Sequence, residues 1–245
     1  MTNHQLKIAL IGYGKMGRTI EQLALQKNHS IKLIIDNQLQ WDSHGKDLAD
    51  CDVAIEFTSP EAAPANIRRC FEAGIPVVTG TTGWLHELPT IEKLCLKMDQ
   101  SLFYASNFSI GVNIFFALNN YLAVLLKNLD GYKPRIIETH HTAKLDAPSG
   151  TAISLAADII KHRQNLKMWG DADQDHAEEV LPIKSYRIEN ITGTHVVTYD
   201  SAIDTIEVKH EAHNRSGFAE GAIIAAQWLI DKKGIYTMKD LMKLA

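Results

Sequence analysis

The segment ETHHTAKLDAPSGTA, residues 138–152, gathers side chains that can move a proton or hold a negative charge. His140 and His141 are adjacent, and Lys144 follows three residues after the second histidine. Histidine exchanges protons near neutral pH, and lysine offers a cation with three hydrogen-bond donors. The small residues that follow are typical of a helix start, where free N–H groups can bind an anion. The segment therefore predicts proton transfer to an anionic ligand.

A glycine-rich turn near the N-terminus predicts a second site. In IALIGYGKMGRTI, Gly12, Gly14 and Gly17 have the G-x-G-x-x-G spacing, between an apolar run and a helical pattern. The first glycine permits a tight turn, the second lets the backbone approach a pyrophosphate, and the third allows close helix–strand packing. The predicted dinucleotide-binding residues are Gly12, Tyr13, Gly14, Lys15, Met16 and Gly17.

Asp36 ends the second apolar run, 19 residues after Gly17. An acid at about this distance usually holds the adenosine ribose 2′-OH, and its charge repels a 2′-phosphate. Asn37 follows it, where an arginine would clamp such a phosphate. The sequence therefore favours NADH, while Lys15 and Arg18 nearby leave NADPH open.

Two loops at predicted strand ends complete the expected cofactor site, because ligands of open α/β sheets bind beyond the carboxyl ends of strands. One loop is VTGTTGW and the other is YASNFSIGVN. Both offer backbone and short polar groups to a nicotinamide and its ribose. The predicted cofactor contacts from these loops are Gly80, Thr81, Thr82, Ala105, Ser106, Asn107 and Phe108.

The elements that must position these residues alternate regularly over the first hundred positions. Apolar runs separated by helical spacing predict parallel βαβ units and a Rossmann-like, doubly wound sheet. The expected strands are 7–12, 31–36, 52–58, 76–83 and 101–106, and the expected helices are 18–27, 60–74 and 88–99.

The pattern changes after Asn107, and indicates a second, mixed α/β domain. Period-two runs predict antiparallel strands with one buried face, and the tail is predicted to be helical. The expected helices are 111–126, 149–162 and 217–244, the strands 134–141, 183–190, 193–200 and 204–213, and a polar loop 170–179. We expect a dinucleotide-binding domain at 1–108 and 216–245, and a mixed-sheet domain at 109–215.

Composition excludes several other classes. The 245 residues carry a net charge of -4, which argues against a general nucleic-acid binder. The three cysteines are widely spaced and odd in number, as in a reducing compartment. The longest apolar stretch, 110–126, is broken by asparagines and predicts a core helix rather than a membrane span. With no signal-peptide pattern at the start, we expect a cytoplasmic protein.

Five motifs occur in one order over nearly the whole chain: GYGKMG, VVTGTTG, SNFSIGVN, ETHHTAKLDAPSGTA and HEAHNRSGFAEGA. Together they closely resemble the dihydrodipicolinate reductases, the 4-hydroxy-tetrahydrodipicolinate reductases of the lysine and diaminopimelate pathway. The resemblance implies a Rossmann-like domain, a mixed α/β substrate domain that also forms a homotetramer, and reduction of a cyclic dicarboxylate with NADH or NADPH.

The resemblance also implies residue roles. His140 would supply the proton, Lys144 would assist in donation or hold a substrate carboxylate, and His141 would contact the substrate. The N–H groups at the helix start would bind a carboxylate, and they belong to Ser149, Gly150 and Thr151. If the strand stays extended, the two histidines should face opposite ways. Arg215 matches a family position, and either a domain contact or a surface ion pair would explain it.

Three alternatives stay open. One is a different nicotinamide dehydrogenase that acts on an amino acid or its imine, and another is a dinucleotide-sensing module without turnover. A zinc site from His140, His141, His210 and His213 is disfavoured, because HEAH lacks the HExxH spacing and no cysteine lies near. We therefore expect no metal.

Overall fold

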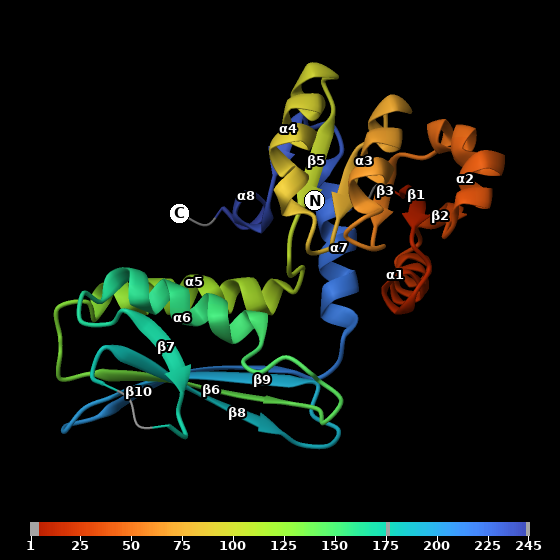
Figure 1. Cartoon of the computed structure of the whole chain (residues 1–245). Helices are drawn as coiled ribbons and strands as arrows, with labels where there is room; N and C mark the ends of the chain where they lie inside the picture. The colour runs from red at the N-terminus through yellow and green to blue at the C-terminus, as the bar shows by residue number, and fades with distance from the viewer. Residues whose placement is uncertain (1–4, 175–176, 244–245) are drawn as a thin grey trace. The chain divides into compact units, whose positions relative to one another are not determined.

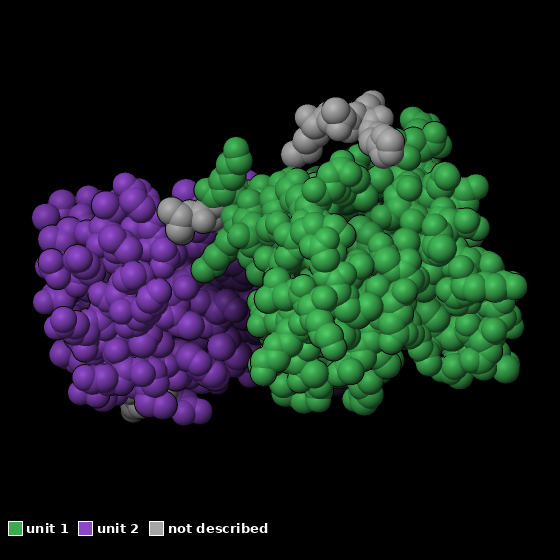
Figure 2. Space-filling view, turned by 90° about the horizontal axis from the view of Figure 1, so that it is seen from above, with its two compact units in different colours: residues 1–110, 216–245 green, residues 111–215 purple. Residues whose placement is uncertain are grey.

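The computed structural model describes residues 5–174 and 177–243. The chain divides into two compact units, unit 1 of residues 1–110 and 216–245 and unit 2 of residues 111–215 (Figure 2). Hydrophobic clusters fill each unit separately. Dinucleotide binding by unit 1 and substrate binding by unit 2 remain predictions.

Unit 1 is a six-stranded parallel sheet in the order β11-β5-β4-β3-β1-β2. Its strands are β1 (Lys7–Ile11), β2 (Ser30–Ile35), β3 (Val53–Glu56), β4 (Val77–Thr79), β5 (Ser101–Tyr104) and β11 (Gly234–Tyr236). Its helices are α1 (Lys15–Gln26), α2 (Gln38–His44), α3 (Ala63–Glu72), α4 (Leu88–Lys97), α7 (Ser216–Leu229) and α8 (Met238–Met242), with short 3₁₀ turns at Gly45–Asp50 and Leu85–Glu87.

The strands of unit 1 are almost wholly apolar because both faces of the sheet are covered. Along β1, Ile8 and Leu10 pack with α1 and α7, and Ala9 and Ile11 pack with the cluster of α3 and α4. The predicted α/β class with a Rossmann-like parallel sheet is confirmed.

Two elements of unit 1 differ from the expectation. Helix α2 was not predicted, and it is capped by Asn37, whose side chain accepts from Gln40 N at 3.1 Å. The tail is not helical throughout, because β11 follows α7 and pairs in parallel with β5 at the sheet edge. Gly234 permits the change with a φ of +113°, in the left-handed region that favours glycine.

Unit 2 packs two helices on one face of a mixed five-stranded sheet in the order β10-β9-β6-β8-β7 (Figure 1). The helices are α5 (Ile110–Leu125) and α6 (Gly150–His162). The strands are β6 (Lys133–His140), β7 (Met168–Asp171), β8 (Val180–Arg187), β9 (Gly193–Asp200) and β10 (Thr205–Ala212).

The expectation of antiparallel strands was wrong for β8, which runs parallel to both β6 and β7. Only the pairs β6–β9 and β9–β10 are antiparallel among the pairings of this sheet in the described residues. The polar loop expected at 170–179 begins inside a strand, since β7 reaches Asp171, and positions 175–176 lie outside the described residues. Within the described ranges, no helix has the length and apolarity needed to cross a bilayer.

Candidate active site

The glycine-rich turn joins β1 to α1, and two of its glycines are required by close packing. Gly12 has a φ of +91°, and a Cβ there would meet the Phe57 carbonyl oxygen at 2.0 Å. A Cβ on Gly17 would meet the Gly12 carbonyl oxygen at 2.3 Å, whereas one on Gly14 would meet nothing within 4 Å. The backbone at Gly14 therefore borders open space at a helix start, where a phosphate could approach. Lys15 is exposed beside it, and Met16 packs against the core.

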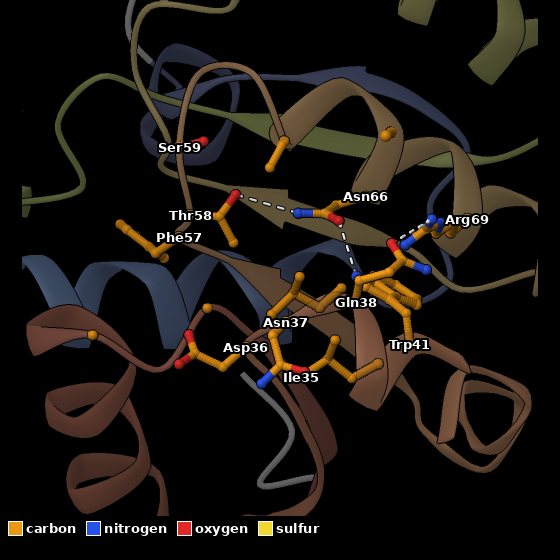
Figure 3. A pocket seen from close by; sticks show the side chains of 15 residues that line it. Ile35, Asp36, Asn37, Gln38, Trp41, Phe57, Thr58, Ser59, Asn66 and Arg69 are labelled. Atoms are coloured by element: carbon orange, nitrogen blue, oxygen red, sulfur yellow. Dashed lines mark hydrogen bonds between the residues drawn. The ribbon is translucent and has the colours of Figure 1, made fainter. Parts of the chain in front are cut away.

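A pocket of about 540 Å³ opens beside this turn. Figure 3 shows Asp36 and Asn37 at the end of β2, facing the stretch from Phe57 to Ser59. The residues that line the pocket are Ile11, Gly12, Gly14, Ile35, Asp36, Asn37, Gln38, Trp41, Phe57, Thr58, Ser59, Ala62, Ala65, Asn66 and Arg69.

Asp36 in this pocket is held against the glycine-rich turn. One of its carboxylate oxygens accepts from the Tyr13 N–H at 2.7 Å. Farther along the pocket, the Arg69 guanidinium stacks 4.8 Å from the Trp41 ring centroid and donates to Gln38 at 3.1 Å. The acid predicted to face the ribose and the glycine-rich turn thus share one pocket.

The loop after β4 is anchored by Glu56, a buried residue that the sequence analysis did not single out. Its carboxylate accepts hydrogen bonds from the hydroxyls of Thr58, Thr79 and Thr81. Burial raises the pKa of Glu56, and these hydroxyl donors partly oppose that shift. Thr81 also accepts from the Thr58 N–H at 2.8 Å, and Thr82 remains exposed.

The loop after β5 carries the remaining predicted cofactor residues. The Ala105 N–H donates to the Thr79 carbonyl at 3.3 Å, and the Asn107 side chain accepts from Ser109 N at 2.9 Å. Ser106 is exposed, whereas Phe108 is buried in the core cluster of unit 1. In the loop after β4, Gly80 is packed so closely that a Cβ there would meet the Phe57 ring at 2.1 Å.

In unit 2, the two adjacent histidines have different surroundings. His140 is the last residue of β6 and only 8% exposed. His141 lies beyond the strand end and is less buried, with its Nε2 atom 3.2 Å from Arg215 Nη2. His140 therefore lies on the covered face of the sheet, whereas His141 lies beyond the end of the strand.

His140 belongs to a buried cluster around Glu138, which is fully buried. The Glu138 carboxylate lies 3.5 Å from His140 Nδ1 and 3.6 Å from His195 Nε2. The two imidazole rings meet edge to face, with centroids 5.0 Å apart. Burial and the neighbouring His195 lower the pKa of His140 to about 4, although Glu138 acts in the opposite direction.

Lys144 lies in the loop between β6 and α6. Its Nζ atom is 2.8 Å from both carboxylate oxygens of Asp146. Arg187 of β8 holds this loop in place, because it donates to the carbonyl oxygens of Lys144 at 3.3 Å and Asp146 at 2.6 Å.

The start of α6 carries the predicted carboxylate-binding residues. Ser149 caps the helix by accepting from Ala152 N at 3.2 Å, and its own N–H donates to Glu138 at 3.0 Å. Its hydroxyl also lies 3.1 Å from His195 Nε2. Gly150 is exposed and Thr151 is half-buried at the first two helical positions, where N–H groups lack intrahelical partners.

Glu138, His140 and His195 also form the group with metal-ligand geometry in the described part of the chain, with ligand atoms within 4.8 Å of one another. Arg187 approaches the same carboxylate at 3.4 Å. A guanidinium this close opposes a divalent cation, so we interpret the group as a charge cluster around the Glu138 carboxylate. His210, from the disfavoured zinc set, instead stacks on Phe115.

Comparison with known sequences decides the family. The profile "Dihydrodipicolinate reductase, N-terminus" matches residues 6–108, and "Dihydrodipicolinate reductase, C-terminus" matches residues 111–242. The chain belongs to the dihydrodipicolinate reductase family. It is 48% identical over 239 residues to the 4-hydroxy-tetrahydrodipicolinate reductase of Christiangramia forsetii, covering 97% of this chain and 98% of that one. The corresponding protein of Staphylococcus aureus is 34% identical over 251 residues, with 96% and 100% coverage.

Solved structures agree at the level of the fold. A dipicolinate-bound dihydrodipicolinate reductase from Paenisporosarcina sp. TG-14 superimposes with a TM-score of 0.75 at 21% identity, over 96% of this chain and 98% of that chain. An amine dehydrogenase from Mycobacterium smegmatis reaches only 0.54 at 12% identity, over 95% and 94%. The predicted family, the oxidoreductase class and the place in lysine and diaminopimelate biosynthesis are confirmed, and the family uses NAD(P)H.

Proposed function

We propose that this member of the dihydrodipicolinate reductase family reduces 4-hydroxy-tetrahydrodipicolinate to tetrahydrodipicolinate, with His140 and Lys144 handling the proton. The ring takes up one hydride and one proton, and the 4-hydroxyl group is lost as water. One observation carries this assignment of roles. The end of β6 and the start of α6 are joined through Glu138, so that His140 and the helix N-terminus form one arrangement in unit 2.

The substrate carboxylates find suitable partners around that arrangement. The N–H groups of Gly150 and Thr151 lack intrahelical partners and would bind a carboxylate at the helix N-terminus, which Ser149 caps. His141 and Lys144 supply further donors from the adjacent loop. The relative from Paenisporosarcina carries dipicolinate, a planar dicarboxylate of the same class, which supports this assignment.

The proton would come from His140 after its charge state has changed. With a pKa of about 4, its imidazole is neutral at pH 7 in the free protein. A bound substrate with two carboxylates favours the imidazolium, because nearby negative charge raises the pKa of a histidine. Substrate binding would thereby load the proton that the reaction consumes.

The cofactor site fits NAD(P)H, since Gly14 leaves room for a phosphate and Asp36 lies in the same pocket. When bound, the cofactor supplies the hydride. We further propose that NADH is preferred over NADPH, because the Asp36 carboxylate would repel a 2′-phosphate and Arg69 is engaged with Trp41 and Gln38. Unit 1 would bind the cofactor from the residues predicted for it, including Thr82 and Ser106.

Two further expectations belong to this proposal. Cytoplasmic residence is one, and a homotetramer assembled through unit 2 is the other. The sheet face opposite α5 and α6 places half-buried Ile137 and Val196 side by side, and the exposed Tyr186 is paired with Thr139 on the same face. A monomeric mass by light scattering would contradict the assembly.

The test follows oxidation of NADH, and of NADPH in parallel, with substrate made in situ by the preceding synthase. We expect turnover with both cofactors, a higher kcat/KM for NADH, and a drop in kcat of about 10²-fold or more for His140→Gln. The exposed His86→Gln is the matched control and should behave as wild type.

The pH dependence tests the charge state of His140. If the free protein must take up a proton there, log(kcat/KM) should fall by one for each pH unit above about 5, because the pKa is about 4. A profile that is flat to pH 7 and falls only below pH 4 would mean that the neutral imidazole is the active form. NADH binding without turnover would instead favour a different dehydrogenase or a sensor.

A further inference from the structure

We propose that Glu138 and Arg187 are positioning residues that fix His140, the Lys144 loop and the start of α6 in one reactive arrangement. This inference rests on the proposed function and extends it to two residues that have no proton-transfer or cofactor-binding role in that proposal. It is carried by the contacts of one ion pair, between the fully buried Glu138 and the partly buried Arg187.

Strand register puts Glu138 at the centre of the arrangement. It is paired with Ser185 on β8 and with His195 on β9. Its carboxylate accepts from Ser185 Oγ at 2.9 Å and from the Ser149 N–H at 3.0 and 3.1 Å. The same carboxylate faces the rings of His140 and His195. One side chain thus joins three strands to the first turn of α6.

Arg187 extends these contacts to the loop that carries Lys144. Its guanidinium lies 3.4 Å from Glu138, and it donates to the carbonyl oxygens of Lys144 and Asp146. It is paired in register with His140 across β6 and β8. A guanidinium can bind a carboxylate and two carbonyls at once because its five donors diverge in a fixed plane.

The ion pair therefore couples the groups that must act together on a dicarboxylate. Movement of Glu138 would shift His140 and turn the N-terminus of α6 away from its place. Movement of Arg187 would release the backbone on either side of Leu145 and with it the Lys144 side chain. Because reaction rates fall steeply when catalytic groups shift by about 1 Å, both changes should lower turnover.

Glu138 also acts on His140 electrostatically. The charged groups that face His140 are Glu138 on its own strand, Arg187 on β8, His195 on β9 and Lys144 in the loop. Of these, Glu138 is the one that favours the imidazolium. Its replacement by a neutral isostere should lower the pKa of His140 further, which loss of packing alone would not do.

The experiment compares Glu138→Gln, Glu138→Asp, Arg187→Gln and Arg187→Lys with wild type, and uses the exposed Glu178→Gln of the same unit as the control. For Glu138→Gln we expect a loss of about 100-fold in kcat/KM, mostly in kcat, and about tenfold weaker binding of dipicolinate by calorimetry. NADH affinity should stay within twofold of wild type. The His140 resonance, assigned with His140→Gln, should titrate at lower pH.

The conservative variants separate positioning from charge. Glu138→Asp keeps the negative charge that raises the pKa of His140, so His140 should titrate closer to wild type than in Glu138→Gln. The loss of kcat should be intermediate. Arg187→Lys cannot reach both carbonyls and should weaken dipicolinate binding as much as Arg187→Gln. If Glu138→Gln fails to fold, the comparison of Glu138→Asp with the two Arg187 variants still decides the question.

Kinetics of Glu138→Gln within twofold of wild type, or an unchanged His140 titration, would overturn the proposal. So would a loss of NADH affinity that matches the loss of kcat, since that result would indicate general destabilisation. Failure of the proposed function gives a different result, in which wild type itself shows no turnover. The His140 titration in the Glu138 variants would still test the positioning proposal in that case.

Discussion

Among the described residues, each unit contains one fully buried glutamate near the end of a strand, and the two carboxylates are held in opposite ways. Glu56 of unit 1 is bound by three threonine hydroxyls, and burial raises its pKa. Glu138 of unit 2 is equally buried, but its interactions with His195, Ser149 and Ser185 outweigh burial and hold its pKa below the usual range.

The difference lies in the donors and not in the burial. Hydroxyl groups can donate to a carboxylate or accept from a carboxylic acid, so they tolerate either protonation state. A backbone N–H at a helix start and a guanidinium can only donate, so they favour the anion. Residue type and burial alone would therefore assign the same charge to Glu56 and Glu138, and only their partners separate them.

This difference matches the tasks proposed for the two units. Glu56 fixes the loop of Thr81 through a network of hydroxyls that needs no particular charge. Glu138 provides a permanent negative charge beside His140, where a proton would be taken up. Three predictions test how far the comparison holds.

The largest effect on stability is expected for Glu138→Gln. Breaking a buried ion pair by removal of one partner costs about 3–5 kcal/mol, because the other charge is left uncompensated. Since the Arg187 side chain is 21% exposed, we expect a value near the lower end, about 3 kcal/mol at pH 7. Urea unfolding of the variant and of Glu178→Gln measures it, and the control should stay within about 0.5 kcal/mol of wild type. A loss no larger than that of the control would mean that Arg187 needs no counter-charge.

Glu56→Gln should cost less, on the order of 1 kcal/mol, since the threonine hydroxyls can reorient to pair with an amide. The same urea titration measures the loss. Glutamine is the informative replacement because it keeps the shape of the side chain, whereas Glu56→Ala would also leave the hydroxyls of Thr79 and Thr81 without this acceptor. If Glu56→Gln were as damaging as Glu138→Gln, the two carboxylates would both be required as anions.

The elements of the fold were predicted where local pattern determines them. The glycine spacing at Gly12–Gly17 and the alternation of apolar runs with helices identified the parallel sheet. The direction of β8 could not be predicted, because a period-two pattern reports which face is buried and not which way a neighbour runs. The three residues of β11 are too few to show a period, and their pairing with β5 depends on tertiary structure.

The site residues were likewise predicted where they are close together in the sequence, and missed where strand pairing brings them together. His140 and Lys144 stand out in the sequence because they lie in one short segment with the helix start. Arg187 and His195 do not, because only strand register brings them to Glu138 from β8 and β9. The available signal was Glu138 itself, a charged residue in phase with the buried positions Pro134 and Ile136 of β6. A carboxylate at such a position needs partners, although the sequence does not say which.

The smallest effect concerns how these stability losses change with pH, and it compares the two glutamates most directly. Glu138 has a folded-state pKa below the usual 4.5. The charged carboxylate therefore makes its full contribution to the free energy of unfolding above pH 4.5, and this contribution is lost only as the pH falls below 4.5. Glu56 has a raised pKa, so wild type gains stability relative to Glu56→Gln as the pH falls through that raised pKa towards 4.5.

Urea unfolding at pH 7, 6, 5 and 4 should therefore show a constant loss of stability for Glu138→Gln down to pH 5, followed by a decrease in that loss. Over the range above pH 5, the loss for Glu56→Gln should increase as the pH falls. Parallel pH profiles for the two variants would show that both carboxylates have the same charge in the folded protein, and that their different donors have no electrostatic consequence.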